Sequence, residues 1–306
     1  MNIIRSLVKG GNFGDDLNDY LWKLLLPNIE SLCPNEVILG TGTLQGMDIS
    51  PNVKKVHVFG SGSNSDPLKA KEWLNKHNFE FHFVRGPLTA RQWNCEDKAL
   101  TDGACLLMLT ELKEIAPTFS KKIGYIPHHV SDQFGDFKSI CELVDVEYIS
   151  AKYHSVPEVI SKIKSCDYII SSSLHGAIVA DLFRKPWIPT KSGPHIYEHK
   201  WNDWCESIKV KYNPHPIDFY ITQNMRNLVR FENIFKRFVA TGGLGKARWA
   251  HKRVLYDSRD TQYIIANQIQ NIIKLGSWNL SSETLTQDLI SKANKLWVNF
   301  EKRITR

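Results

Sequence analysis

The stretch Ser171-Ser-Ser-Leu-His-Gly176 lies between two segments with different patterns. Before it, Cys166-Asp-Tyr-Ile-Ile170 is a short β-branched and aromatic run, which indicates a buried strand. After it, residues 176–185 have the composition of a helix, and Pro186 ends that helix. The serines and His175 therefore occupy a turn between a strand and a helix N-terminus. In open parallel sheets, ligands bind at such turns.

The chemistry of this turn suits an anion. Free backbone N–H groups and the positive end of the helix dipole favour negative charge. Three hydroxyls and one imidazole suit the binding of a phosphate or carboxylate and the transfer of a proton. An equally open interpretation is a serine-rich N-cap with a histidine that forms only local hydrogen bonds.

Composition limits the function classes. The chain has 306 residues, a length typical of two domains, and a net charge of +7. Its six cysteines form no CxxC pair and match no metal-site spacing, which is typical of reduced thiols in a cytosolic protein. There is no signal-peptide pattern and no run of about 18 apolar residues. We therefore expect a cytoplasmic protein without a metal site.

Basic residues gather in the last third of the chain, which includes a glycine run over residues 241–246 that we interpret as a connector. The charge could serve nucleic acid, an anionic membrane surface or phosphorylated substrates, or it could be a solvated face. The sequence has no zinc-finger spacing and no RNA-binding signature, so no specific nucleic-acid partner is expected. It indicates no particular oligomeric state.

Strands and helices alternate up to about residue 190, which predicts an α/β protein with mostly parallel sheets. A polar, proline-containing segment near residue 115 indicates a break between two such sheets. Other strand ends also carry candidate site residues. These are the Gly-rich loop over residues 10–16, Arg85, and the pair His128 and His129. Arg85 suits a carboxylate or phosphate, or a structural ion pair.

In this order, the sequence resembles the polysaccharide pyruvyl transferase family over roughly residues 1–220. The matching motifs are Gly11-Asn-Phe-Gly-Asp-Asp-Leu-Asn18, Arg85-Gly-Pro87, Thr101-Asp-Gly-Ala104, Pro127-His128 and Ser171-Ser-Ser-Leu-His-Gly-Ala177. The resemblance implies two Rossmann-like domains with a central cleft, as in glycosyltransferase-B enzymes. We expect these domains at residues 1–115 and 121–220, followed by a basic helical extension over residues 221–306.

The resemblance also implies transfer of pyruvate from phosphoenolpyruvate to two sugar hydroxyls of a glycan precursor, forming a ketal. The partners are then a small-molecule donor and a glycan acceptor, with phosphoenolpyruvate as co-substrate and no cofactor or metal. His175 is our candidate general acid. Asp15 is the candidate base, with His129 as the alternative, and Asp15 could equally cap its helix. The expected donor-binding residues are Arg85, Ser172, Ser173, Leu174, Gly176 and Lys191, and the expected acceptor-binding residues are Asn12, Asp16 and His129.

Two positions depart from the family pattern. Ser173 stands where the family often has an arginine, and Lys191 or Arg184 would then compensate at the donor phosphate. Gly103 replaces a proline after Asp102, which is a milder change.

Two other functions stay open. One is a glycosyltransferase of the same architecture that uses a nucleotide sugar. The other is a non-enzymatic protein that binds nucleic acid or another polyanion through the basic C-terminal third. For an enzyme, we expect the extension to dock at an anionic membrane. Truncation after about residue 240 separates these functions, because catalysis that survives while polyanion binding is lost would make the extension an accessory.

Overall fold

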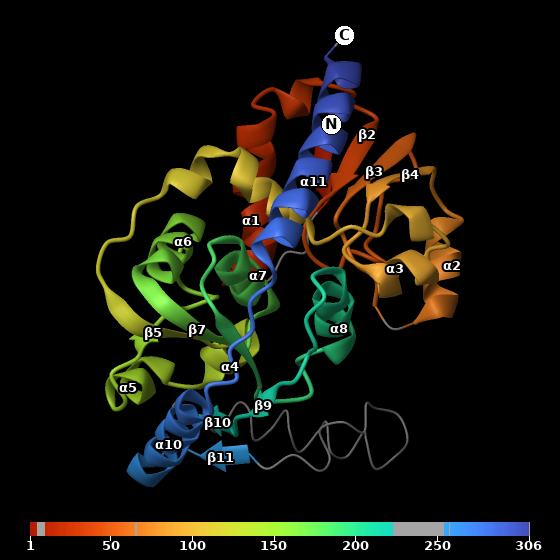
Figure 1. Cartoon of the computed structure of the whole chain (residues 1–306). Coiled ribbons are helices and arrows are strands. Elements are labelled where there is room, and N and C mark those ends of the chain that lie inside the picture. The colour runs from red at the N-terminus through yellow and green to blue at the C-terminus, as the bar shows by residue number, and fades with distance from the viewer. Residues whose placement is uncertain (5–9, 65, 223–253, 257, 306) are drawn as a thin grey trace, which may run out of the picture.

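The computed structural model describes residues 1–4, 10–64, 66–222, 254–256 and 258–305 (Figure 1). Within these residues the chain is a mixed α/β protein with parallel sheets, as the alternation predicts. The first sheet has the order β1 (Asn2–Ile4), β2 (Glu36–Leu39), β3 (Lys55–Phe59), β4 (Phe79–Phe83). The second has the order β6 (Glu147–Tyr148), β5 (Lys121–Ile126), β7 (Cys166–Ser171), β8 (Trp187–Lys191), β9 (His215–Pro216). A separate pair joins β10 (Phe219–Ile221) to β11 (Val254–Tyr256).

Alternating side chains place the first sheet between two layers of helices. Val56 and Val58 face a core that includes Trp73 of α2 (Pro67–Leu74) and Ala90 of α3 (Pro87–Gln92). Phe59 faces the opposite core, where α1 (Phe13–Leu25) contributes three large side chains: Leu17, Leu21 and Trp22. Short 3-10 helices complete this part of the chain: η1 (Ile29–Ser31), η2 (Glu96–Lys98), η3 (Gly103–Leu109) and η4 (Glu111–Glu114).

In the second sheet, the chain adds strands first on one side of β5 and then on the other. The chain pairs β5 with β6 on one side and with β7 on the other, which creates a topological switch point between β5 and β7. Ligands of open parallel sheets bind outside the carboxyl ends of strands at such a point. Around this sheet lie α4 (His129–Phe134), α5 (Phe137–Glu142), α6 (Val156–Ser165), α7 (Leu174–Leu182) and α8 (Glu198–Ser207).

Helix α1 connects the two sheets. It packs against both α6 and α7, so one apolar core is shared by the two α/β units. The backbone N–H of Phe13 also donates to the carbonyl of Ala151, at 2.7 Å. This hydrogen bond fixes the start of α1 beside the segment that follows β6.

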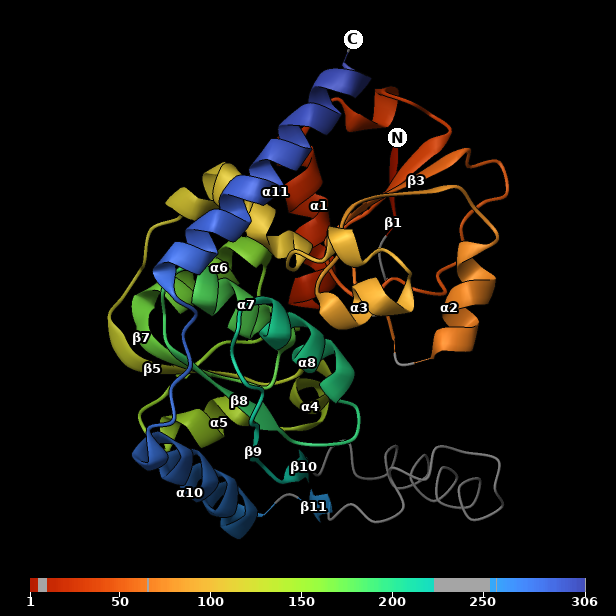
Figure 2. The same ribbon diagram turned by 45° about the vertical axis from the view of Figure 1, so that its right-hand side comes forward.

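The C-terminal segment does not stand apart from the α/β units. Its described part contains two long helices, α10 (Arg259–Leu275) and α11 (Glu283–Ile304). Helix α10 packs on α5 of the second unit, whereas α11 returns to the first and lies across α1 (Figure 2). The ring centroid of Trp297 is 5.6 Å from that of Trp22, and that of Phe300 is 5.0 Å from that of Phe59. The two helices thus complete cores on both units.

The glycine run over residues 241–246 lies outside the described residues, as do most of the basic residues that suggested a polyanion or membrane contact. Across the described part of the chain, no helix has the length and apolar character needed to cross a membrane.

Candidate active site

A cavity of about 280 Å³ opens at the carboxyl ends of strands from both sheets. Loops after β2, β4, β5, β7 and β8 contribute to it, together with the start of α1. Its walls are formed by Asn12, Asp15, Gly42, Thr43, Arg85, His128, His129, Ser173, Leu174, His175, His195, Ile196, Tyr197, Lys200 and Trp201.

The serine turn holds His175 at the first turn of α7. Ser173 is the N-cap, and its hydroxyl accepts a hydrogen bond from the backbone N–H of Gly176 at 3.4 Å. The Ser171 hydroxyl accepts from the Ser173 N–H at 3.1 Å and donates to the Ser173 carbonyl at 2.7 Å. The N-cap interpretation therefore describes the local structure, and the turn also presents Ser173, Leu174 and His175 to the cavity.

Behind His175 lies a carboxylate for which the sequence suggested no role. Nε2 of His175 is 3.8 Å from Oδ1 of Asp102, a distance at which a small side-chain movement would form a hydrogen bond. Asp102 is fully buried, and among the residues that the structure describes neither its Oδ2 nor His175 Nε2 has a hydrogen-bond partner. Burial raises the pKa of Asp102 to about 6, although Arg85 acts in the opposite direction. Asp102 can therefore orient the imidazole and stabilise its charged form.

The opposite side of the imidazole meets the first α/β unit. A Cβ atom added at Gly14 would lie 1.9 Å from Nδ1 of His175, so only glycine leaves room for the ring there. Burial lowers the pKa of His175 to about 4, and Asp15 opposes that shift. Burial also raises the pKa of Asp15, which accepts a hydrogen bond from the side chain of Asn12 at 2.6 Å. Burial thus shifts the pKa values of an imidazole and a carboxyl group toward each other, and the two groups meet across the cavity.

Arg85 is fully buried and is held by side chains from distant parts of the chain. Its Nε donates to Oδ2 of Asp203 on α8 at 3.0 Å, its Nη1 to Thr43 Oγ1 at 2.9 Å, and its Nη2 to the Ser63 carbonyl at 3.4 Å. These bonds occupy three of the five guanidinium N–H donors. Arg85 therefore forms the structural ion pair of one sequence interpretation, and it also lines the cavity.

Helix α8 supplies a second cation that the sequence did not indicate. Lys200 lines the cavity, and burial together with the nearby Arg85 lowers the pKa of its amine to about 8. His128 and His195 also face the cavity, with ring centroids 4.8 Å apart. Burial lowers the pKa of His128, and it lowers that of His129 to about 4. The cavity therefore carries basic side chains on several sides.

Four of the expected site residues lie outside the cavity wall. Ser172 is buried, and its hydroxyl is 2.6 Å from Thr190 Oγ1. Gly176 is buried within α7. Lys191 forms an ion pair with Glu198 on the surface. Asp16 accepts a hydrogen bond from the backbone N–H of Asn12 at 3.0 Å, which supports the loop rather than lining the cavity.

The remaining expected residues meet at the cavity wall. They are Asn12, Asp15, Arg85, His129, Ser173, Leu174 and His175. The sequence analysis gave Asp102 no role, although this residue belongs to the matching motif Thr101-Asp-Gly-Ala104. Its place in that motif was the signal that could have identified it as a site residue. Lys200 and Asp203 belong to no motif, so only the fold brings them to the site.

Residues 7–192 match the family model described as polysaccharide pyruvyl transferase. This span exceeds half of the chain, so the chain belongs to the polysaccharide pyruvyl transferase family, and the resemblance seen in its motifs is confirmed. Over 213 residues it is 34% identical to the succinoglycan biosynthesis protein ExoV of Rhizobium meliloti (strain 1021). The match covers 67% of this chain and 64% of ExoV, so this chain spans less than two thirds of that relative.

Two solved structures of the wall teichoic acid polymerase TagF align with 90% of this chain and 89% of theirs. Their sequence identity is 11% and their TM-score is 0.35, a similarity too low to support an argument about fold or function.

Proposed function

We propose that this chain transfers pyruvate from phosphoenolpyruvate to two hydroxyls of a sugar in a polysaccharide or its precursor, forming a pyruvate ketal. The donor carries a phosphate and a carboxylate, and it must accept a proton on its methylene carbon. The observation that carries the proposal is the position of His175, which shares one cavity with Arg85, Lys200 and the carboxyl group of Asp15.

The basic side chains provide an anion site. Arg85 has N–H donors beyond the three that bond to described residues, and Lys200 adds an ammonium group on the same cavity wall. The N-terminus of α7 adds backbone N–H groups at Leu174 and His175. In this arrangement Lys200, rather than Lys191 or Arg184, takes the place of the arginine that the family often has at Ser173.

In the reaction, His175 gives a proton to the methylene carbon of phosphoenolpyruvate, which makes C2 electrophilic. A sugar hydroxyl adds to C2 and loses its proton to a base. The bond between C2 and the phosphate oxygen then breaks, and phosphate leaves. A second hydroxyl adds to C2 and closes the ring. One of the two hydroxyl protons restores His175, and the other leaves with phosphate.

The charges around His175 support its role as the acid. Its pKa is about 4 because the ring is buried and lies near Arg85 and Lys200. A bound phosphate and carboxylate offset those cations, so donor binding raises the pKa of His175 and protonates it where it is needed. Asp102 stabilises the resulting imidazolium from behind.

Asp15 is the proposed base, because its carboxyl lines the cavity and burial raises its pKa. His129 lines the same cavity and is the alternative base. Asn12 lies beside Asp15 and is proposed to bind the acceptor. The cavity takes residues from loops of both sheets, which supports two Rossmann-like domains with the active site in the cleft between them.

The test is direct. The protein is incubated with phosphoenolpyruvate and oligosaccharides of a pyruvylated exopolysaccharide, and phosphate release and the ketal methyl signal are measured by NMR. We expect one phosphate for each ketal, and in D2O we expect one deuterium in the methyl group. Phosphate release without a ketal on any acceptor, or activity that is unchanged in His175→Gln, contradicts the proposal.

A further inference from the structure

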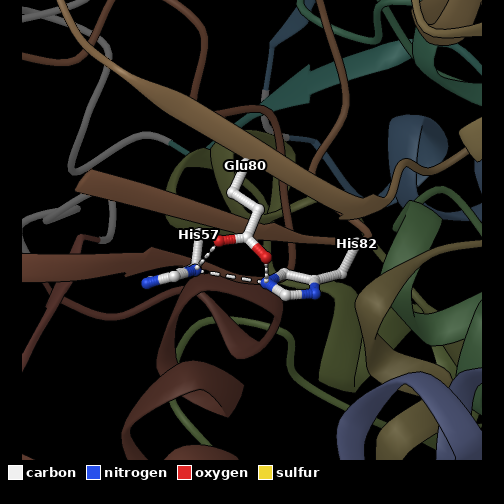
Figure 3. Close-up of side chains that lie close together, drawn as sticks. All are labelled: His57, Glu80 and His82. Atoms are coloured by element: carbon white, nitrogen blue, oxygen red, sulfur yellow. Dashed lines mark hydrogen bonds and ion pairs between the residues drawn. The ribbon is translucent and has the colours of Figure 1, made fainter. Parts of the chain in front are cut away.

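Three side chains of metal-ligand type meet on one face of the first sheet and take no part in the cavity (Figure 3). His57 is on β3, whereas Glu80 and His82 are on β4. The strand register places His57 opposite Glu80, and His82 follows Glu80 by two residues, so all three side chains project from the same face.

This face is covered. The ring of Phe300 on α11 lies 4.8 Å from that of His57 and 5.0 Å from that of His82. The side chains of His57 and His82 are 1% and 10% exposed, and that of Glu80 is 28% exposed. Three ionisable groups beneath the apolar face of a helix are costly unless their polar atoms are paired or bind an ion.

The spacing of the ligand atoms fits a single ion. His57 Nδ1 is 3.2 Å from His82 Nε2 and 3.5 Å from Glu80 Oε2, and His82 Nε2 is 3.7 Å from Glu80 Oε1. In a tetrahedral zinc site the metal–ligand distances place neighbouring ligand atoms about 3.3–3.6 Å apart. Figure 3 shows one nitrogen of each imidazole and the carboxylate group of Glu80 pointing toward the same small space.

A fourth residue orients the first ligand. Glu36 Oε2 on β2 is 2.7 Å from His57 Nε2 and accepts a hydrogen bond from its N–H. The lone pair of His57 Nδ1 then points toward His82 and Glu80. A carboxylate behind a ligating histidine is the usual support of a zinc ligand.

We propose that His57, Glu80 and His82 bind one divalent ion of the zinc class, with water in a fourth position. Imidazole and carboxylate ligands together suit Zn2+ and its neighbours in the first transition row rather than Mg2+. The ion would join β3 to β4 beneath the last turns of α11, and it would stabilise the fold because it binds the folded state alone.

Two cations compete with the ion for Glu80. Arg303 Nη1 is 2.7 Å from Glu80 Oε1, and Lys55 Nζ is 3.4 Å from Glu80 Oε2. Both cations are partly exposed, and such pairs contribute little to stability, so Glu80 can exchange them for a divalent ion at small cost. Removing Arg303 should therefore strengthen metal binding.

The experiment uses the full-length protein, treated with a chelator, dialysed and titrated with Zn2+ by calorimetry. Co2+ replaces Zn2+ for absorption spectra, and Mg2+ is the negative control. We expect one ion per chain. Binding should weaken at least a hundredfold in His82→Gln and in Glu80→Gln, and about 10–100-fold in Glu36→Gln. It should strengthen in Arg303→Gln and stay unchanged in His77→Gln, a control on the loop before β4.

Folding of each variant is checked by circular dichroism. Zn2+ should raise the thermal midpoint of the wild type and of His77→Gln, but not that of His82→Gln. Wild-type binding no tighter than that of Glu80→Gln overturns the proposal and leaves a hydrogen-bonded network without an ion. Binding that survives His82→Gln but is lost in His128→Gln also overturns it, because the ion would then lie in the cavity.

Discussion

Arg85, in the loop after β4, and Asp203, on α8, form an ion pair in which both side chains are buried, with Nε and Oδ2 3.0 Å apart. Asp203 also accepts hydrogen bonds from the backbone N–H of Thr89 at 3.0 Å and from the Thr89 hydroxyl at 2.5 Å. The pair therefore joins the first α/β unit to the helix that carries Lys200. It holds two cations of the proposed donor site on one wall of the cavity.

Asp203→Asn should lower the free energy of unfolding by about 3–5 kcal/mol, because it leaves the Arg85 charge buried without its partner. Denaturant unfolding measures this loss. Glu206→Gln is the matched control on the same helix. It breaks an exposed pair with Arg91 at 3.5 Å and should change stability by less than about 1 kcal/mol. Equal losses of unfolding free energy in the two variants would show that the buried pair contributes no more to stability than the exposed pair.

His175→Gln and Asp102→Asn should separate the acid from the residue that positions it. Loss of the acid should lower turnover about 10²–10⁴-fold and leave donor binding nearly intact. Because Asp102 is proposed to stabilise the imidazolium, loss of its charge should lower the pKa of His175 and move the pH limb that requires protonated His175 to lower pH. Turnover against pH measures both effects. A uniform loss of turnover in Asp102→Asn, with no displacement of that limb, would assign Asp102 a structural role alone.

Lys200 should make donor binding depend on pH. Its pKa is about 8, so its ammonium is charged below that pH and becomes neutral above it. The dissociation constant for phosphoenolpyruvate should therefore rise as the pH passes 8. Lys200→Arg should move this rise to higher pH, and Lys200→Met should bind weakly with no rise. Calorimetry between neutral and alkaline pH gives the values. A wild-type rise that persists in Lys200→Met would assign the titration to another group.

Trp297→Ala should lower the free energy of unfolding by about 3–5 kcal/mol, because the indole packs in the core shared with Trp22 and Phe59. Lys295→Ala changes an exposed position of the same helix and should have an effect within about 0.5 kcal/mol.

Truncation after about residue 240 removes α10 and α11, so it should unfold the chain and abolish catalysis. A truncated protein that keeps its stability and activity would show that α11 is an accessory.

The local parts of this protein could be predicted from sequence. Each strand followed by a Gly- or Ser-rich turn was visible, because such turns are encoded by adjacent residues, and the start of α7 at Ser173 follows from its own neighbours. Parallel sheets then bring those turns to one edge. This accounts for Asp15, Arg85 and His175 meeting at one cavity.

Contacts between distant segments could not be predicted from the sequence patterns. Asp203 lies 118 positions from Arg85, and nothing in the residues around it marks a partner. The amphipathic pattern of α11 indicates a buried face but not the sheet that it covers, so we expected an extension where the structure has part of the core. His57 and His82 project from the same face of neighbouring strands, and only the packing of α11 makes that face an interior.

The identity of the donor is the central claim, and calorimetric titration of the full-length protein with phosphoenolpyruvate tests it most directly. Nucleotide sugars serve as the alternative ligands, and Lys200→Met and His175→Gln as the variants. We predict one phosphoenolpyruvate bound per chain, much weaker binding in Lys200→Met, nearly unchanged binding in His175→Gln, and no binding of nucleotide sugars. Binding of a nucleotide sugar that Lys200→Met weakens, with none of phosphoenolpyruvate, would contradict the account.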